Sequence, residues 1–91
     1  MRFNALVIGG SEKSVHVALC LPGTFNPAAL DKGQVFPLSK VLSQKELDMP
    51  SKKINVIDSV GESKERVGIP TVLEIDESFI AKLPQLADLA L

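Results

Sequence analysis

The sequence has no tryptophan or tyrosine and contains only one cysteine, one histidine and four phenylalanines. The aromatic side chains that usually stack on nucleic-acid bases are therefore scarce. The lone cysteine cannot form a disulfide within the chain, so nothing here requires an oxidising compartment. The first apolar run, FNALVIGG, is too short for a signal peptide or a membrane span. These absences predict a cytoplasmic protein that does not enter the membrane.

A strong charge of either sign is also missing. Ten Lys and Arg residues stand against eleven Asp and Glu, which gives a formal charge of −1. A nucleic-acid-binding protein normally concentrates positive charge on one face, and no basic block appears beyond Lys52 and Lys53. The sequence therefore argues against a nucleic-acid partner. Only folding could assemble a basic face, from Lys40, Lys45, Lys52, Lys53, Lys64 and Arg66.

What is present is typical of a small folded protein. With 91 residues, 45% hydrophobic and 23% charged, the chain predicts a single domain over residues 1–91. Two apolar runs, 3–8 and 15–21, flank the turn-rich segment GGSEKS and predict a β-hairpin. Further strands are predicted at 34–38, 52–58 and 71–76.

Two helices are predicted between these strands. NPAALDKG, residues 26–33, has a capping asparagine and a proline at the first helical position. In LSQKELDMP, Ser43 and Glu46 have the spacing of a capping box, and Pro50 ends the segment. The polar segment 59–68 is predicted to be a helical turn or a loop.

The last fifteen residues, ESFIAKLPQLADLAL, carry an apolar stripe with helical spacing. Pro84 must kink or split this helix, because its ring clashes with the preceding turn. The four apolar strand segments and the apolar stripe of the helix must bury their apolar side chains against each other, and this requires at least two layers of secondary structure. We therefore predict an α+β fold, in which a small mixed or antiparallel sheet of three to five strands has the C-terminal helix packed on one face.

An alternative fold comes from the stretch VGIPTVLEID, which resembles a segment of thioredoxin-like proteins where Ile-Pro-Thr leads into a sheet strand. The resemblance covers ten of 91 residues and implies a thioredoxin-like α/β fold. That family places a Cys-x-x-Cys pair after an early strand, whereas here SEKS follows, so no redox activity is carried over. Because few X-Pro bonds are cis, we expect a trans bond at Pro70.

His16 and Cys20 lie four positions apart in VHVALCLPG. In a strand this spacing places both side chains on one face about 13 Å apart, too far for a nucleophile and its base. A metal site needs three or four ligands, and only one residue of each type exists. We predict a core or half-buried role for Cys20 and no cofactor.

Three carboxylates are the candidate metal ligands. Glu74 and Asp76 lie on one face of a predicted strand, about 6 to 7 Å apart, and Asp58 ends the preceding strand. Such a group can hold a divalent cation or act as an acid and a base. It can equally be a solvated face leading into a helix N-terminus, where negative charge is favourable, and we prefer this second interpretation.

No complete catalytic constellation is visible, so the sequence predicts a non-catalytic binding or regulatory module that acts through a protein interface. Because the C-terminal tail is apolar, we predict that Leu83, Leu86 and Leu89 form that interface. Its partner is predicted to be another protein or a second copy of the chain. The alternative is a small enzyme that uses either a divalent metal on the carboxylates or the Cys20 thiol.

Overall fold

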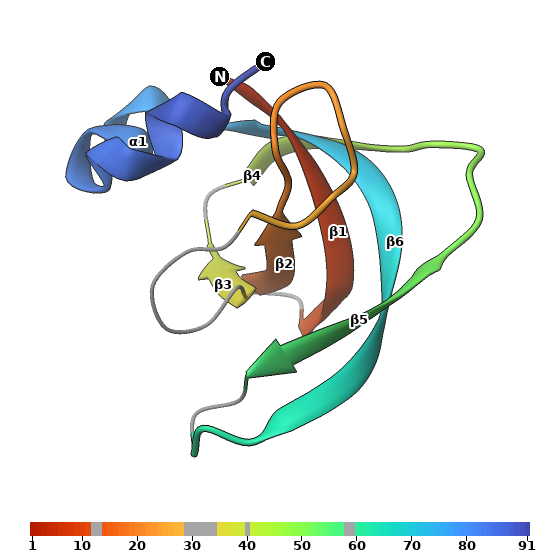
Figure 1. Cartoon of the computed structure of the whole chain (residues 1–91). Helices are drawn as coiled ribbons and strands as arrows, with labels where there is room; N and C mark the ends of the chain where they lie inside the picture. The colour runs from red at the N-terminus through yellow and green to blue at the C-terminus, as the bar shows by residue number, and fades with distance from the viewer. Residues whose placement is uncertain (12–13, 29–34, 40, 58–59) are drawn as a thin grey trace.

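The computed structural model describes the chain except residues 12–13, 29–34, 40 and 58–59 (Figure 1). Two helical segments lie at the C-terminus, the α-helix α1 (Glu77–Lys82) and the 3-10 helix η1 (Pro84–Leu89). The strands are β1 (Arg2–Ser11), β2 (Ser14–Leu19), β3 (Val35–Leu38), β4 (Val41–Glu46), β5 (Lys52–Ile57) and β6 (Ser63–Ile75).

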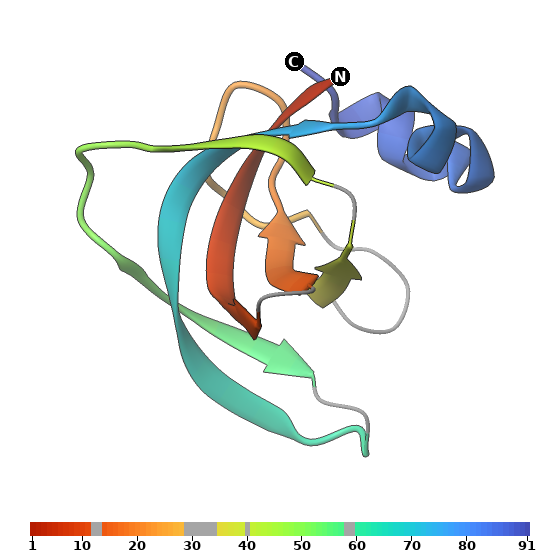
Figure 2. The same cartoon turned by 180° about the vertical axis from the view of Figure 1, so that it is seen from behind.

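The strands pair in the order β3-β2-β1-β6-β4, with β5 also paired to β6, and each of these pairs is antiparallel. The 13-residue strand β6 organises the sheet. Its second half pairs with β1 and β4, while its first half, residues 63–68, pairs with β5. Figures 1 and 2 show that β6 bends along its length, so that the ribbon of β5 and the first half of β6 extends away from the helical end.

The predicted α+β fold is therefore wrong. A six-stranded antiparallel sheet dominates the described part of the chain, and the α-helix is a single short element, not a layer. The thioredoxin-like alternative fails as well, because that fold requires parallel strands and every described pairing is antiparallel. The bond before Pro70 is trans, as expected.

Two segments account for most of the difference between the predicted and the observed fold. Ser43 and Glu46 do not cap a helix; they lie in β4, opposite Glu74 and Thr71 of β6. A capping interaction contributes about 1 kcal/mol, less than a complete set of ladder hydrogen bonds along a long neighbouring strand. Of the polar segment 59–68, predicted as a helical turn or a loop, residues 60–62 lie outside any strand, but residues 63–68 form the first half of β6. The predicted helix at 26–33 falls largely outside the described residues.

The other predicted strands are confirmed in position. The early hairpin is the β1–β2 pair, with a register shift between Val7 and Gly9, and β3 and β5 lie where strands are predicted. Pro84 splits the C-terminal helix, since α1 ends at Lys82 and η1 begins at the proline. Among the described residues, no helix has the length and apolar character needed to span a membrane.

Side-chain alternation gives the sheet two faces. The inner face carries the main core, which contains buried residues of β1, β2, β3 and β6 and is covered at one end by Ile80, Leu86 and Leu89 of the helical segments. The outer face carries a smaller cluster of Leu6, Ala18 and Cys20, against which Ile8, Phe25 and Ile54 pack. The main strand residues of the inner cluster are Phe3, Ala5, Val17, Leu19, Leu38, Leu73 and Ile75.

Both chain ends are fixed at the same end of the sheet. The Met1 ammonium group donates a hydrogen bond to the Ile75 carbonyl at 3.0 Å, and the Leu91 amide donates to the Arg2 carbonyl at 2.9 Å. The Oδ1 atom of Asp76 accepts from the Ser78 amide at 2.9 Å and so caps α1. Figures 1 and 2 accordingly show the two termini side by side, next to the helical segments.

Candidate functional site

The structure separates His16 and Cys20 by environment. His16 lies in β2 and is exposed, whereas Cys20 follows β2 and is fully buried in the outer-face cluster. The Cys20 Sγ atom donates a weak hydrogen bond to the Ala18 carbonyl at 3.8 Å. Burial raises the pKa of the Cys20 thiol to about 11, against a smaller lowering caused by Lys52. The thiol is therefore protonated at neutral pH and shielded from solvent, which is unsuitable for a nucleophile.

The three candidate metal ligands do not form a described cluster. Asp76 uses its carboxylate to cap α1, and Glu74 lies on the outer face opposite Arg2. Asp58 lies outside the described residues. In the part of the chain that the structure describes, no group of three His, Cys, Asp or Glu residues is placed to hold a metal ion.

The leucines predicted as an interface face the chain's own core instead. Leu86 is fully buried and Leu89 is 6% exposed, both within the inner-face cluster. Leu83 is partly buried against the same cluster. The apolar stripe of the C-terminal segment covers one end of the sheet, so Leu86 and Leu89 are not available on the surface, whereas Leu83 remains partly exposed.

Polar side chains gather instead on the outer face, where strands β1, β6 and β4 run side by side. Strand pairing sets Arg2, Glu74 and Ser43 in one row across the three strands, and Asn4, Val72 and Lys45 in the next. Residues paired directly across antiparallel strands point to the same face. A hollow of about 270 Å³ opens there, and its lining residues are Arg2, Ser43, Lys45, Val72 and Glu74.

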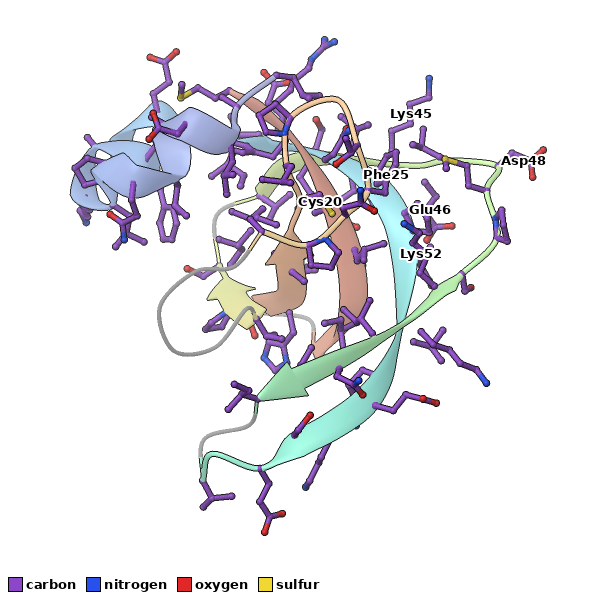
Figure 3. All side chains as sticks on the ribbon, in the orientation of Figure 1. Cys20, Phe25, Lys45, Glu46, Asp48 and Lys52 are labelled. Carbon is purple, nitrogen blue, oxygen red and sulfur yellow. The ribbon has the colours of Figure 1, made fainter. Side chains whose placement is uncertain are left out.

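The loop of residues 21–26 lies beside this hollow and is tied down from two sides. Asn4 Nδ2 donates to the Thr24 carbonyl at 2.9 Å. Lys52 Nζ donates to the Phe25 carbonyl at 3.1 Å and to Asn26 Oδ1 at 3.4 Å. These bonds hold Phe25 over the outer-face cluster, and Figure 3 shows Phe25 on the loop that follows β2, with Lys45 on β4 and Lys52 on β5 labelled.

A second unusual surface lies on the β5–β6 ribbon. The inner-face side chains of β6 belong to the core from Thr71 to Ile75 but are exposed from Ser63 to Ile69. Ile57 is 51% exposed, Val67 52% and Ile69 40%. We call this surface the ribbon face; it consists of Lys53, Asn55, Ile57, Glu65, Val67 and Ile69.

Sequence reasoning missed both surfaces because it placed no strand at 41–46 or 63–68. Alternation within ESKERVGI was the available signal, since Val67 and Ile69 are spaced for one face of a strand. The hollow had no local signal, because its residues come from three strands far apart in the chain.

The fold defines a small antiparallel β protein with a short helical cap. Comparisons with known proteins found no match to a protein-family model, to a curated protein or to a solved structure.

Proposed function

We propose that this protein is a non-catalytic binding module that acts through a protein interface, and that the interface is the ribbon face. The observation that carries the proposal is the run of exposed β-branched side chains on a side of β6 that is core elsewhere in the same strand. Exposed apolar surface that continues from a core is typical of an interaction site. A cytoplasmic location is part of the proposal, since the lone cysteine is buried and unpaired.

The proposed occupant is a second copy of the chain, because the ribbon face is complementary to itself. Val67 lies opposite Lys53 on β5 and two residues from Glu65 on its own strand. A two-fold contact centred on Val67 therefore brings Lys53 of one copy toward Glu65 of the other, and the same pair forms a second time by symmetry. The apolar residues supply the burial, and the charged pairs fix the register.

The test is sedimentation velocity over a concentration series with the full chain. We expect the average mass to rise toward twice that of one chain, and Val67→Glu to abolish the rise because it places a charge at the centre of the contact. Leu42→Glu is the matched control: Leu42 is 65% exposed but lies on β4, so its replacement should leave association unchanged.

A charge exchange makes the test independent of folding defects. Lys53→Glu and Glu65→Lys should each weaken association by placing like charges together, and the double variant should restore it. A mass that stays at one chain at every concentration would overturn the proposal. So would association that responds equally to Val67→Glu and Leu42→Glu.

A further inference from the structure

The fold collects positive charge on the outer face of the sheet, although the whole chain carries a formal charge of −1. Strand register places Arg2 opposite Glu74, Lys45 opposite Val72 and Lys52 opposite Gly68, all on the side of β6 that also carries Arg66. With Lys64 on the same side, five of the ten basic residues share this face. Among described strand residues, Glu74 is the one carboxylate on it.

The helical end of the molecule carries more acidic than basic side chains. Asp76 and Glu77 begin α1, and Asp88 lies in η1, whereas Lys82 is the one basic residue of this helical end. The helical end thus carries three carboxylates against one cation, whereas the outer face of the sheet carries five cations against Glu74. A local positive surface of this kind attracts an anionic partner in spite of the total charge.

The shape of the basic surface indicates a chain-like ligand. The basic surface extends along β6 from the level of Glu74 to that of Arg66. This distance is eight residues, or about 26 Å at the usual rise of a strand. A small anion in the hollow would meet Arg2 and Lys45 but leave Lys52 and Arg66 unused. The four cations come from four strands but lie at successive levels along β6, which fits a polymer that carries a charge on each unit.

An aromatic ring stands beside these cations. Phe25 is half-buried against the outer-face cluster, and its loop is held by the hydrogen bonds from Lys52 and Asn4. A ring next to a row of cations is the arrangement with which proteins bind single-stranded nucleic acid, because unpaired bases stack on rings while phosphates meet the cations. Among the described residues the helical segments lie at one end of the sheet, and the outer-face residues named here belong to strands and to the loop of residues 21–26, not to a helix that could enter a duplex groove.

We infer that the outer face binds single-stranded nucleic acid, with Arg2, Lys45, Lys52 and Arg66 meeting successive phosphates and Phe25 stacking on a base. The inference goes beyond the proposed function, since it concerns the opposite side of β6 from the ribbon face. It also reverses the expectation drawn from the sequence, in which these cations are scattered.

The experiment measures fluorescence anisotropy of a fluorescein-labelled oligo-dT strand, about 20 nucleotides long, titrated with the full-length protein. Four phosphate contacts predict a log–log salt slope of about −2.8, equivalent to an affinity loss of about 50-fold between 50 and 200 mM salt. Lys45→Glu and Arg66→Glu should each weaken binding and reduce the magnitude of the slope by about 0.7. Lys82→Glu makes the same charge change on α1 and should leave both unchanged.

A Phe25→Trp variant reports on the base contact, because the natural chain contains no tryptophan. Its fluorescence should be quenched when unlabelled oligo-dT binds. Absence of binding at 50 mM salt would overturn the inference, as would equal effects of Lys45→Glu and Lys82→Glu. If a poly-glutamate peptide of equal charge competes as well as oligo-dT, the ligand is an acidic protein segment and the inference is also overturned.

Discussion

At the scale of single residues, Cys20 shows how burial decides what a reactive side chain can do. Its Sγ atom lies in an apolar cluster, and the nearby charge of Lys52, which lowers the pKa of the thiol, offsets only part of the effect of burial. The thiol enzyme considered from the sequence would need the opposite, an exposed thiol with a lowered pKa. Cys20 instead acts as a small apolar residue.

Cys20 should make the stability of the protein fall at alkaline pH. Its pKa rises from an ordinary value of 9.0 to about 11 on folding, so the native state favours the neutral thiol. The contribution is complete below pH 9 and is lost as the pH rises through 11, an overall loss of about 2 to 3 kcal/mol in the free energy of unfolding. Urea titrations at a series of pH values measure this loss.

The matched variant is Cys20→Ala, which is less stable at every pH because it leaves a small cavity, but lacks the part of the slope that comes from the thiol. The lysines titrate in both proteins, so the difference between the two slopes isolates Cys20. Parallel slopes between pH 9 and 11 would contradict the burial seen for this residue.

At the scale of elements, β6 determines the architecture through its length and its bend. This one strand pairs with β1, β4 and β5, and its inner face is exposed to solvent up to Ile69 and buried in the core from Thr71 onward. Gly68 lies where the pairing passes from β5 to β1 and β4. The backbone there approaches the Leu6 side chain closely, which leaves no room for a methyl group.

Gly68→Ala should therefore destabilise the protein. An added Cβ atom would lie 2.7 Å from the Leu6 Cβ, an atom that moves only with its backbone. Relieving such an overlap costs about 1 to 3 kcal/mol, measured as a lower denaturation midpoint at constant m-value. Gly9→Ala adds the same methyl group to β1 with no atom within 4 Å, and should change stability by less than about 0.5 kcal/mol. Equal effects of the two changes would show that the sheet tolerates a Cβ at the bend.

The element scale also shows where prediction from the sequence failed. The β1–β2 hairpin was predictable because both strands and their turn lie within one short segment. β4 was not, since Ser43 and Glu46 have helix-capping spacing and only the distant residues of β6 make this segment a strand. Of the candidate site, Lys45 and Lys52 were visible as cations, but their common face depends on pairing with β6.

At the scale of the whole molecule, the helical cap and the sheet share one core. Leu86 of η1 is fully buried among inner-face residues, and the Leu91 amide is bonded to Arg2 of β1. The cap therefore contributes to the stability of the entire fold.

Leu86→Ala should lower the free energy of unfolding by about 2 to 5 kcal/mol, because it opens a cavity where the cap meets the sheet. Leu91→Ala is the control, since Leu91 is 57% exposed and its truncation should cost less than about 0.5 kcal/mol. Thermal or urea denaturation followed by circular dichroism measures both. If Leu86→Ala left stability unchanged but reduced self-association, Leu86 would belong to an interface, as its position in the apolar tail first indicated.

The sequence by itself determined the features that depend on near neighbours: the early hairpin, the strands around Val35 and Ile54, and the break at Pro84. The tertiary structure alone decided that residues 41–46 and 63–68 are strands, that Leu86 and Leu89 are buried, and that cations scattered along the chain share one face. The physical reason is that a strand is stabilised by the edge of another strand, and its register assigns every side chain to a face. Neither the edge nor the register is encoded in the few residues around each position.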